Sequence, residues 1–160
     1  MSAAKYFAGH SLGEYSALAC ADSLTFSQTI KLLNKRGHAM QSAVPTGQGG
    51  MLAVLGPDIK KINEILEKNK EIFKCYIAND NSIGQVVVSG NNNDLEKFSL
   101  ELTNNKIKSI KLPVSAPFHC KLMNSATKIM EEEISNVKFN TPKVDIISNV
   151  TSEPINEISD

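Results

Sequence analysis

The 160-residue sequence has few cysteines, no excess of charge of either sign and no long hydrophobic run. The three cysteines, Cys20, Cys75 and Cys120, are far apart and form no C-x-x-C pair, which argues against a disulfide framework or a zinc site. We therefore expect reduced thiols in a cytoplasmic protein. The 17 basic and 17 acidic residues cancel, so no net field would attract nucleic acid or an anionic membrane surface.

No segment approaches the ~18 consecutive apolar residues that a membrane span requires. The first residues, MSAAKYFAGHS, also lack the basic region and long apolar stretch of a secretory signal. A hydrophobic fraction of 41% and a charged fraction of 21% are ordinary for a globular protein. The length predicts one domain, or one domain with a small inserted subdomain. The balanced charge and the lack of a long apolar run predict that neither nucleic acid nor a membrane is a partner.

What the sequence does contain, almost at its start, is a G-x-S-x-G motif, Gly9-His10-Ser11-Leu12-Gly13. Lys5–Ala8 before it is predicted to be a strand, and the small residues from Glu14 onward predict a closely packed helix. A strand, a sharp turn and a helix form the setting of a nucleophile elbow. The helix would direct its N–H groups and its positive end toward an oxyanion. Ser11 is therefore a candidate nucleophile, and the structural alternative is that it only caps the helix.

A second helix is predicted between a capping box at Thr25 and Gln28 and the helix-ending Pro45. Its apolar positions recur at helical spacing: Phe26, Ile30, Leu33, Gly37 and Met40. Arg36 borders this apolar face, where an unpaired guanidinium would be costly. It could form a salt bridge with Glu14 or another acid, extend to the surface, or bind the carboxylate of a substrate in a bidentate manner.

A nucleophilic serine also needs a base, and His119 is the best candidate among the three histidines. It follows a turn constrained by Pro113 and Pro117, which we expect at the edge of the main sheet, where a general base would be held in place. His10 would point away from Ser11 on an extended turn, so a packing role is expected for it. His38 is expected at the surface of the second helix.

The residues between these candidates predict a β-α-β-β-α-β subdomain of ferredoxin-like type. Its predicted strands are Met51–Leu55, Cys75–Ala78, Gln85–Ser89 and Ile107–Leu112, with helices that begin near Asp58 and Asn91, a flexible loop at 46–50 and a turn at 79–84. After it, a helix is predicted over Lys121–Asn136, with Leu122, Ala126, Ile129, Met130 and Ile134 inward, and then a strand over Val144–Val150. The predicted fold class is α/β. Residues 1–47 and 113–160 would form part of a hydrolase-like α/β subdomain, and residues 48–112 the insert.

Five stretches of the sequence together resemble the malonyl-CoA:acyl carrier protein transacylase family of bacterial fatty acid synthesis. In the order and spacing of that family, they are GHSLGEYSALACA, NKRGHAMQSAVP, GQGGMLAVLG, NDNSIGQVVVSG and LPVSAPFHCKLM. The resemblance implies a hydrolase-like α/β subdomain with a ferredoxin-like insert. It also implies that Ser11 is the acylated nucleophile, that His119 is its general base and that the N–H of Leu12 is an oxyanion donor.

The same resemblance suggests how the substrate would be bound. Arg36 would pair with the free carboxylate of the malonyl group, and Met40 and Asn81 would lie near the pocket. Phe118 would stand against a branched α-carbon and so favour malonyl over methylmalonyl. The substrates would be malonyl-CoA and the phosphopantetheine thiol of acyl carrier protein, with no metal or permanently bound cofactor. Full-length relatives are expected to be monomers.

Two family elements are not found in this sequence. Members of the family carry a G-Q-G-S-Q segment upstream of the nucleophile, whose glutamine supplies a second oxyanion donor. They also carry, further downstream, a residue whose backbone carbonyl orients the histidine. Gln48 lies in a different loop and does not replace the missing glutamine. The resemblance therefore leads us to expect a fragment of a longer enzyme.

Two alternatives to an active malonyl transferase stay open on the sequence alone. A serine esterase or thioesterase would need an acidic residue between Ser11 and His119, for which Asp80 and Asp94 are the candidates. Both lie in the predicted insert, and such an enzyme has no use for Arg36. The other alternative is a catalytically incompetent truncated remnant that binds acyl carrier protein or another chain.

Overall fold

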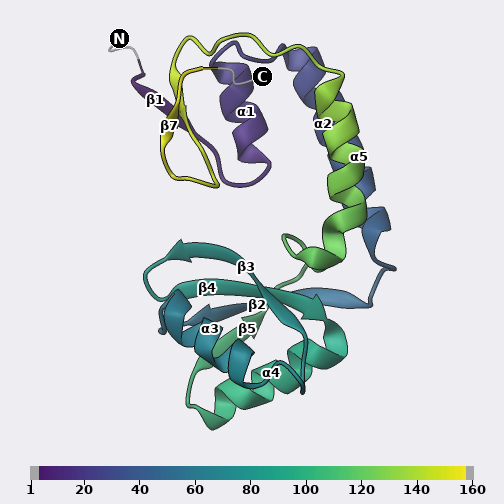
Figure 1. The fold of residues 1–160 in the computed structure, drawn as a ribbon, viewed down its shortest axis with the longest axis vertical. Coiled ribbons are helices and arrows are strands. Elements are labelled where there is room, and N and C mark those ends of the chain that lie inside the picture. The colour runs from purple at the N-terminus through teal and green to yellow at the C-terminus, as the bar shows by residue number, and fades with distance from the viewer. Residues whose placement is uncertain (1–3, 158–160) are drawn as a thin grey trace. The chain divides into compact units, whose positions relative to one another are not determined.

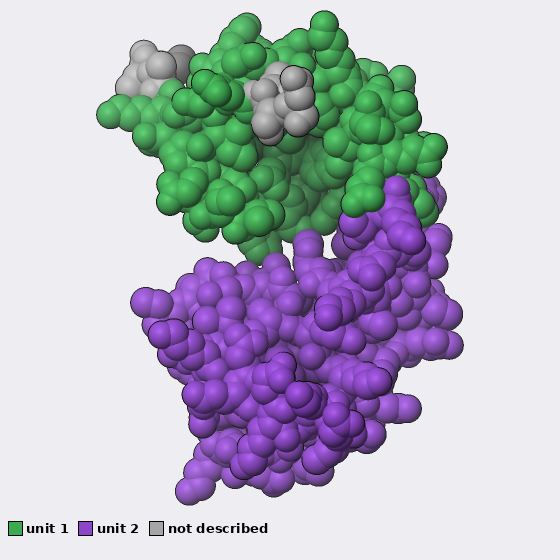
Figure 2. Space-filling model, in the orientation of Figure 1, with its two compact units in different colours: residues 1–37, 129–160 green, residues 38–128 purple. Residues whose placement is uncertain are grey.

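The computed structural model describes residues 4–157. The chain forms two compact units, one of residues 1–37 with 129–160 and the other of residues 38–128 (Figure 2). The division falls within two helices, α2 (Phe26–Ala43) and α5 (Asn124–Ser135). The subdomain boundaries expected from the sequence, 47/48 and 112/113, stay a prediction, and its outermost residues, 1–3 and 158–160, lie outside the described part of the chain.

The first unit contains a three-stranded sheet with the order β1-β6-β7 (Figure 1). The strands are β1 (Tyr6–Ala8), β6 (Asp145–Ile147) and β7 (Pro154–Ile155). β1 and β6 run parallel, with Ala8 opposite Ile147, and β7 pairs with β6 in the antiparallel direction. Since neighbouring parallel strands end at the same edge of a sheet, the segments that follow β1 and β6 lie side by side.

Helix α1 (Gly13–Cys20) packs on this sheet through small side chains, because Ala17 and Ala21 are buried against Ile146. Helices α2 and α5 lie next to each other (Figure 1), with Leu32 of α2 and Met130 of α5 in one buried cluster. Lys35 and Glu133 join the same two helices by an ion pair of 2.9 Å.

The apolar faces predicted for these two helices are partly wrong. On α2, Phe26 and Ile30 are exposed, and the buried positions are Thr29, Leu32 and Ala39. The segment Lys121–Met123 is a 3-10 turn that precedes α5, and the side chains of Leu122, Ile129 and Ile134 are at least 36% exposed. Periodicity fixes the spacing of an apolar stripe, but the side that is buried depends on where the neighbouring elements pack.

The second unit is a four-stranded antiparallel sheet with two helices on one face (Figure 1). Its elements are β2 (Gly49–Leu55), α3 (Ile59–Lys68), β3 (Cys75–Ser82), β4 (Gln85–Asn91), α4 (Asn92–Asn104) and β5 (Lys108–Lys111), and the strand order is β3-β4-β2-β5. This is the predicted β-α-β-β-α-β succession. Asp58 and Asn91 cap the two helices by accepting hydrogen bonds from the N–H groups of Lys61 and Asp94, both at 2.9 Å. The core comprises Leu52, Val54, Ile62, Ile65, Phe73, Val86, Val88, Leu95, Phe98 and Leu102.

Two loops of the second unit are shorter than the sequence suggests. Gly49 and Gly50, expected in a flexible loop, are buried residues of β2. The turn expected at 79–84 contains only Ile83 and Gly84, because β3 continues to Ser82 through two irregularities in its pairing with β4. Gly84 adopts a φ of +81°, which favours glycine in so tight a turn. Pairing with β4 therefore overrides the turn preference of Asn79, Asp80 and Asn81.

Strand β6 is also shorter than the predicted Val144–Val150. It ends at Ile147, and a turn at residues 148–153 leads into β7. Within residues 4–157, no helix combines the length and the apolar character needed to cross a bilayer.

Candidate active site

Ser11 lies in a tight turn between β1 and α1, as the G-x-S-x-G motif predicts. The N–H of Gly13 donates to the carbonyl of His10 at 2.9 Å, and the N–H of Glu14 donates to the carbonyl of Ser11 at 3.1 Å. Ser11 has a φ of +54°, in the left-handed region that non-glycine residues seldom adopt. The N-cap position of α1 is Leu12, so Ser11 does not occupy the capping position that the structural alternative requires. This is the geometry of a nucleophile elbow.

Gly9 makes this turn sterically possible. A Cβ atom at position 9 would overlap the carbonyl group of Gly13 in the first turn of α1. At position 13, by contrast, a Cβ atom would meet nothing within 4 Å. The first glycine of the motif is therefore required for close approach of strand and helix, and the second is not required for space.

Arg36 reaches Ser11 from the middle of α2. Its Nη2 donates a hydrogen bond of 2.9 Å to the Oγ of Ser11. Both side chains are half-buried. Burial raises the pKa of the Tyr15 hydroxyl, and the nearby positive charge of Arg36 opposes that rise. The guanidinium therefore contacts the candidate nucleophile and lies close enough to Tyr15 of α1 to affect its pKa.

The salt bridge considered for Arg36 is not found. None of the ion pairs within residues 4–157 includes Arg36. The carboxylate of Glu14 instead accepts a hydrogen bond of 3.2 Å from the backbone N–H of Asn149. With no carboxylate of the described chain on it, the Arg36 guanidinium is suited to bind an acidic group beside Ser11.

Asn149 is a site residue that the sequence did not reveal. Its Oδ1 accepts a hydrogen bond of 2.7 Å from the N–H of Ser11, and its Nδ2 donates one of 2.6 Å to the carbonyl of Gly9. The sequence predicted a strand over Val144–Val150, in which Asn149 would be one more residue of the sheet. Its contact with the Ser11 turn was therefore not expected. The signal that could have found it is the pairing of β1 with β6, because residues that follow neighbouring parallel strands meet at one edge.

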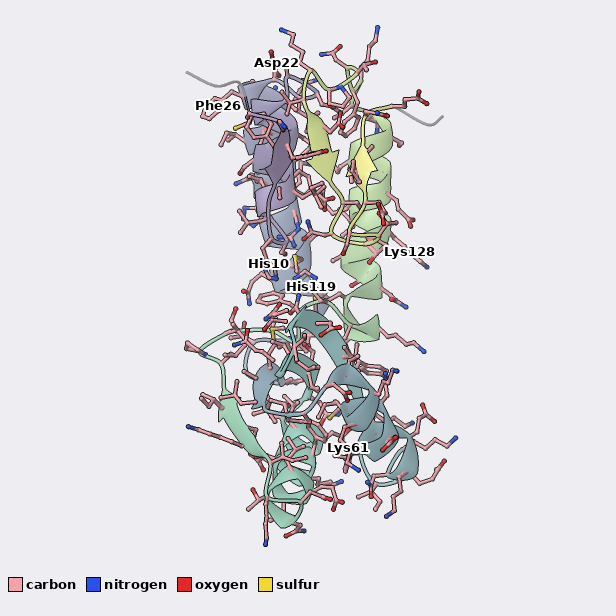
Figure 3. The ribbon with its side chains drawn as sticks, turned by 90° about the vertical axis from the view of Figure 1, so that its left-hand side faces the viewer. His10, Asp22, Phe26, Lys61, His119 and Lys128 are labelled. Atoms are coloured by element: carbon pink, nitrogen blue, oxygen red, sulfur yellow. The ribbon has the colours of Figure 1, made fainter. Side chains whose placement is uncertain are left out.

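His119 is held in place by its neighbours in the second unit. It has a φ of +57° and lies on the segment between β5 and the turn that leads into α5 (Figure 3). The buried hydroxyl of Ser89 on β4 donates a hydrogen bond of 2.6 Å to the carbonyl of Phe118. The segment is therefore anchored to the four-stranded sheet, and its expected position at the edge of the main sheet stays a prediction. Ser11 belongs to the first unit and His119 to the second, so their pairing stays a prediction.

Three further predicted site residues, Met40, Asn81 and Phe118, also lie in the second unit. Met40 is half-buried near the end of α2, and Phe118 is half-buried beside His119. Asn81 is exposed near the end of β3, where its Nδ2 donates to the Oε1 of Gln85 at 3.2 Å. The structure brings Ser11 and Arg36 together, and the roles of Met40, Asn81 and Phe118 stay predictions.

The acids that an esterase would need belong to the second unit. Asp80 is on β3, and the Oδ2 of Asp94 on α4 accepts hydrogen bonds from the N–H of Lys74 and the Nδ2 of Asn91, at 3.0 and 2.8 Å. Among the described residues, no group of three or more His, Cys, Asp or Glu side chains could hold a metal ion. Burial raises the pKa of the Cys75 thiol to about 12, so this cysteine is unsuited to act as a nucleophile.

These features define the class of protein. An α/β fold that presents a serine on a strand–turn–helix elbow, with a guanidinium at its hydroxyl, fits an acyl-transfer enzyme. The sequence profile described as "Acyl transferase domain" matches residues 3–158, and the chain belongs to that family.

The relatives within the family are more specific. The malonyl CoA-acyl carrier protein transacylase of Salmonella typhimurium is 40% identical over 144 residues, which are 89% of this chain and 47% of that protein. The crystal structure of malonyl CoA-acyl carrier protein transacylase from Clostridium perfringens has a TM-score of 0.91 at 40% identity, covering 96% of this chain and 48% of the other.

A third relative was solved with a protein partner. It is described as a type II PKS acyl-carrier protein in complex with its malonyl-transacylase. It has a TM-score of 0.91 at 34% identity and covers 98% of this chain and 51% of the other. The chain thus spans about half the length of the curated relatives that it matches.

Proposed function

We propose that this chain carries the malonyl-accepting site of a malonyl-CoA:acyl carrier protein transacylase of fatty acid biosynthesis. The observation that carries the proposal is the 2.9 Å hydrogen bond from the Nη2 of Arg36 to the Oγ of Ser11. A guanidinium at this distance can bind a carboxylate located a few atoms beyond a serine-bound carbonyl, and malonyl is an acyl group that ends in a carboxylate. The names of the relatives support the same substrate.

In the first half-reaction, the Oγ of Ser11 attacks the thioester carbonyl of malonyl-CoA, and its proton passes to His119. The tetrahedral oxyanion is stabilised by the N–H of Leu12 and by the positive end of α1. The C–S bond then breaks, and coenzyme A leaves as a thiol that takes the proton from His119. The malonyl group remains on Ser11 as an ester, with its carboxylate on Arg36.

In the second half-reaction, the phosphopantetheine thiol of acyl carrier protein gives its proton to His119 and its sulfur attacks the carbonyl of this ester. The C–O bond to Ser11 then breaks, and the Ser11 oxygen takes that proton from His119. The reaction is ping-pong, with no metal and no permanently bound cofactor. The relative in complex with an acyl-carrier protein supports this protein partner. The free thiols Cys20, Cys75 and Cys120 support a cytoplasmic location.

The remaining assignments belong to the same proposal. His119 is the general base, and Met40 and Asn81 line the substrate pocket. Phe118 limits substitution at the α-carbon of the acyl group. The catalytic residues Ser11 and His119 would both belong to a hydrolase-like subdomain, residues 1–47 and 113–160, and residues 48–112 would form its ferredoxin-like insert.

The test is incubation of the folded chain with malonyl-CoA, followed by intact-mass measurement and peptide mapping. We expect one malonyl adduct, located on Ser11 and absent from Ser11→Ala. Ser16→Ala is the matched control, because Ser16 is an exposed residue of α1 and its loss should leave the adduct unchanged. Addition of acyl carrier protein with its phosphopantetheine arm should then remove the adduct.

Three outcomes would contradict the proposal. An adduct on another residue would exclude Ser11 as the acceptor. Equal acylation by malonyl-CoA and by simple ester substrates, unaffected by loss of Arg36, would favour a serine esterase. A folded chain that forms no adduct at all would show that this chain does not catalyse the transfer alone.

A further inference from the structure

A single side chain connects both ends of the turn that presents Ser11. The Oδ1 of Asn149 accepts a hydrogen bond of 2.7 Å from the N–H of Ser11, and its Nδ2 donates one of 2.6 Å to the carbonyl of Gly9. The backbone N–H of Asn149 donates to the carboxylate of Glu14, in the first turn of α1, at 3.2 Å. Asn149 thus contacts Gly9 before the serine, Ser11 itself and the helix that follows.

The backbone that carries Asn149 is fixed independently of the elbow. The Oγ of Ser148, which is buried, accepts hydrogen bonds from the N–H groups of Val150 and Thr151 at 3.1 and 3.3 Å. The N–H of Ser148 donates to the carbonyl of Glu153 at 3.0 Å, which closes the turn between β6 and β7. Since β6 is paired in parallel with β1, this turn is held beside the segment that follows β1.

Ser11 needs such support, because its left-handed backbone conformation, with a φ of +54°, is unfavourable for a residue with a side chain. A conformation of this kind persists only when the surrounding structure determines it. Asn149 satisfies the N–H of Ser11 and the carbonyl of Gly9 in that conformation, and an asparagine amide is the group that can both accept and donate across the turn.

We propose that Asn149 is the positioning residue of the active site. It fixes the backbone of Ser11 so that the Oγ stays within reach of Arg36, and it occupies the N–H of Ser11. The next amide, that of Leu12, is then the one that faces the oxyanion. The inference rests on the proposed function in that Ser11 is taken as the acylated residue, but it does not depend on which acyl group Ser11 receives.

The variants separate the two hydrogen bonds made by the side chain. Asn149→Ala removes both, and Asn149→Asp keeps an acceptor for the N–H of Ser11 while it loses the donor to Gly9. We expect the rate of Ser11 acylation at saturating malonyl-CoA to fall ~10–100-fold in Asn149→Ala and less in Asn149→Asp, because misplacement of a reacting group by ~1 Å can cost ~100-fold. The malonyl-CoA concentration at half-maximal rate should change by less than about twofold, because Arg36 stays in place.

Thr151→Ala is the matched control. Thr151 lies in the same turn, where its Oγ1 accepts the N–H of Glu153 at 3.3 Å and makes no contact with the elbow in the hydrogen bonds described. Hydrogen exchange of the Ser11 amide provides a readout independent of catalysis. It should accelerate at least ~10-fold in Asn149→Ala and stay unchanged in Thr151→Ala, because an amide that loses its acceptor is exposed to exchange by local opening. Unchanged exchange on β4 would show that the variant is folded.

The outcomes distinguish this inference from the proposed function. A fluorophosphonate probe, which reacts with activated serines of any acyl specificity, is applied to the same variants. If malonyl-CoA gives no adduct but the probe labels wild-type Ser11 and labels Asn149→Ala more slowly, the malonyl substrate is wrong and the role of Asn149 stands. Wild-type acylation rates in Asn149→Ala, or unchanged exchange of its Ser11 amide, would overturn the role of Asn149. Failure of wild-type Ser11 to react with either reagent would overturn both.

Discussion

The Nη2 of Arg36 lies 2.9 Å from the Oγ of Ser11, to which it donates a hydrogen bond. The two residues are 25 positions apart in the sequence and are brought together by the packing of α2 beside α1. A guanidinium at a serine hydroxyl does not help a simple esterase, because it offers a fixed positive charge that only an acidic acyl group can use. This contact is therefore the observation on which the proposed dicarboxylic acyl group rests.

Loss of the Arg36 charge should remove selectivity and spare the nucleophile. In Arg36→Ala, we expect malonylation of Ser11 to fall ~10–100-fold, since hydrogen bonds to charged groups contribute about 1.5–3 kcal/mol. Acetyl transfer from acetyl-CoA should be kept or increased. Lys35→Ala is the control, because Lys35 pairs with Glu133 and does not reach Ser11. Equal loss of both acyl transfers would mean that Arg36 only supports the fold.

Replacement of His119 tests the predicted base. General-base catalysis contributes typically ~10²–10⁴-fold, so His119→Ala should slow the acylation of Ser11 by that order. His38→Ala, on the exposed side of α2, should acylate at the wild-type rate. The rate of Ser11 acylation in both variants is measured by stopping the reaction at a series of times and determining the amount of adduct. Wild-type acylation by His119→Ala would exclude His119 as the base.

A methyl group at Gly9 should disrupt the elbow. In Gly9→Ala the new Cβ would overlap the Gly13 carbonyl, and rigid backbone cannot move aside as a flexible side chain can. We expect a loss of ~1–3 kcal/mol in the free energy of unfolding, measured with urea, together with loss of Ser11 acylation. Gly37→Ala is the matched control: it has space at an exposed helix position and should stabilise α2 by about 0.5–1 kcal/mol. Equal stability of the two variants would contradict the close approach.

The buried Cys75 thiol should respond to alkaline pH. Burial raises its pKa from 9.0 to about 12 in the folded chain, so the folded state retains a proton that the unfolded state loses. The free energy of unfolding should be unaffected by this group below pH 9.0 and decrease as the pH rises from 9.0 toward 12. Urea unfolding at increasing pH measures this slope, and it should be smaller in Cys75→Ser. Alkylation by iodoacetamide near neutral pH should modify the exposed Cys20 before Cys75.

Much of the fold follows from local features of the sequence. The caps at Asp58 and Asn91, the short apolar strands and the alternation of strand and helix predict the β-α-β-β-α-β unit, because each signal acts over a few neighbouring residues. The elbow is local for the same reason: G-x-S-x-G between a strand and a helix leaves few other conformations for Ser11. The identity of the candidate nucleophile and of Arg36 as an unusual charge could thus be predicted.

Other features depend on partners that are distant in the sequence. The exposure of Phe26 and Ile30, the end of β6 at Ile147 and the extension of β3 through Asn81 were decided by packing and strand pairing, which outweigh local preference. Asn149 contributes only because β6 lies parallel to β1, and Arg36 reaches Ser11 only because α2 packs beside α1. The sequence by itself determined which groups are available for the chemistry. Only the tertiary structure decided which of them meet, because a hydrogen bond shorter than 3 Å depends on how whole elements pack against one another.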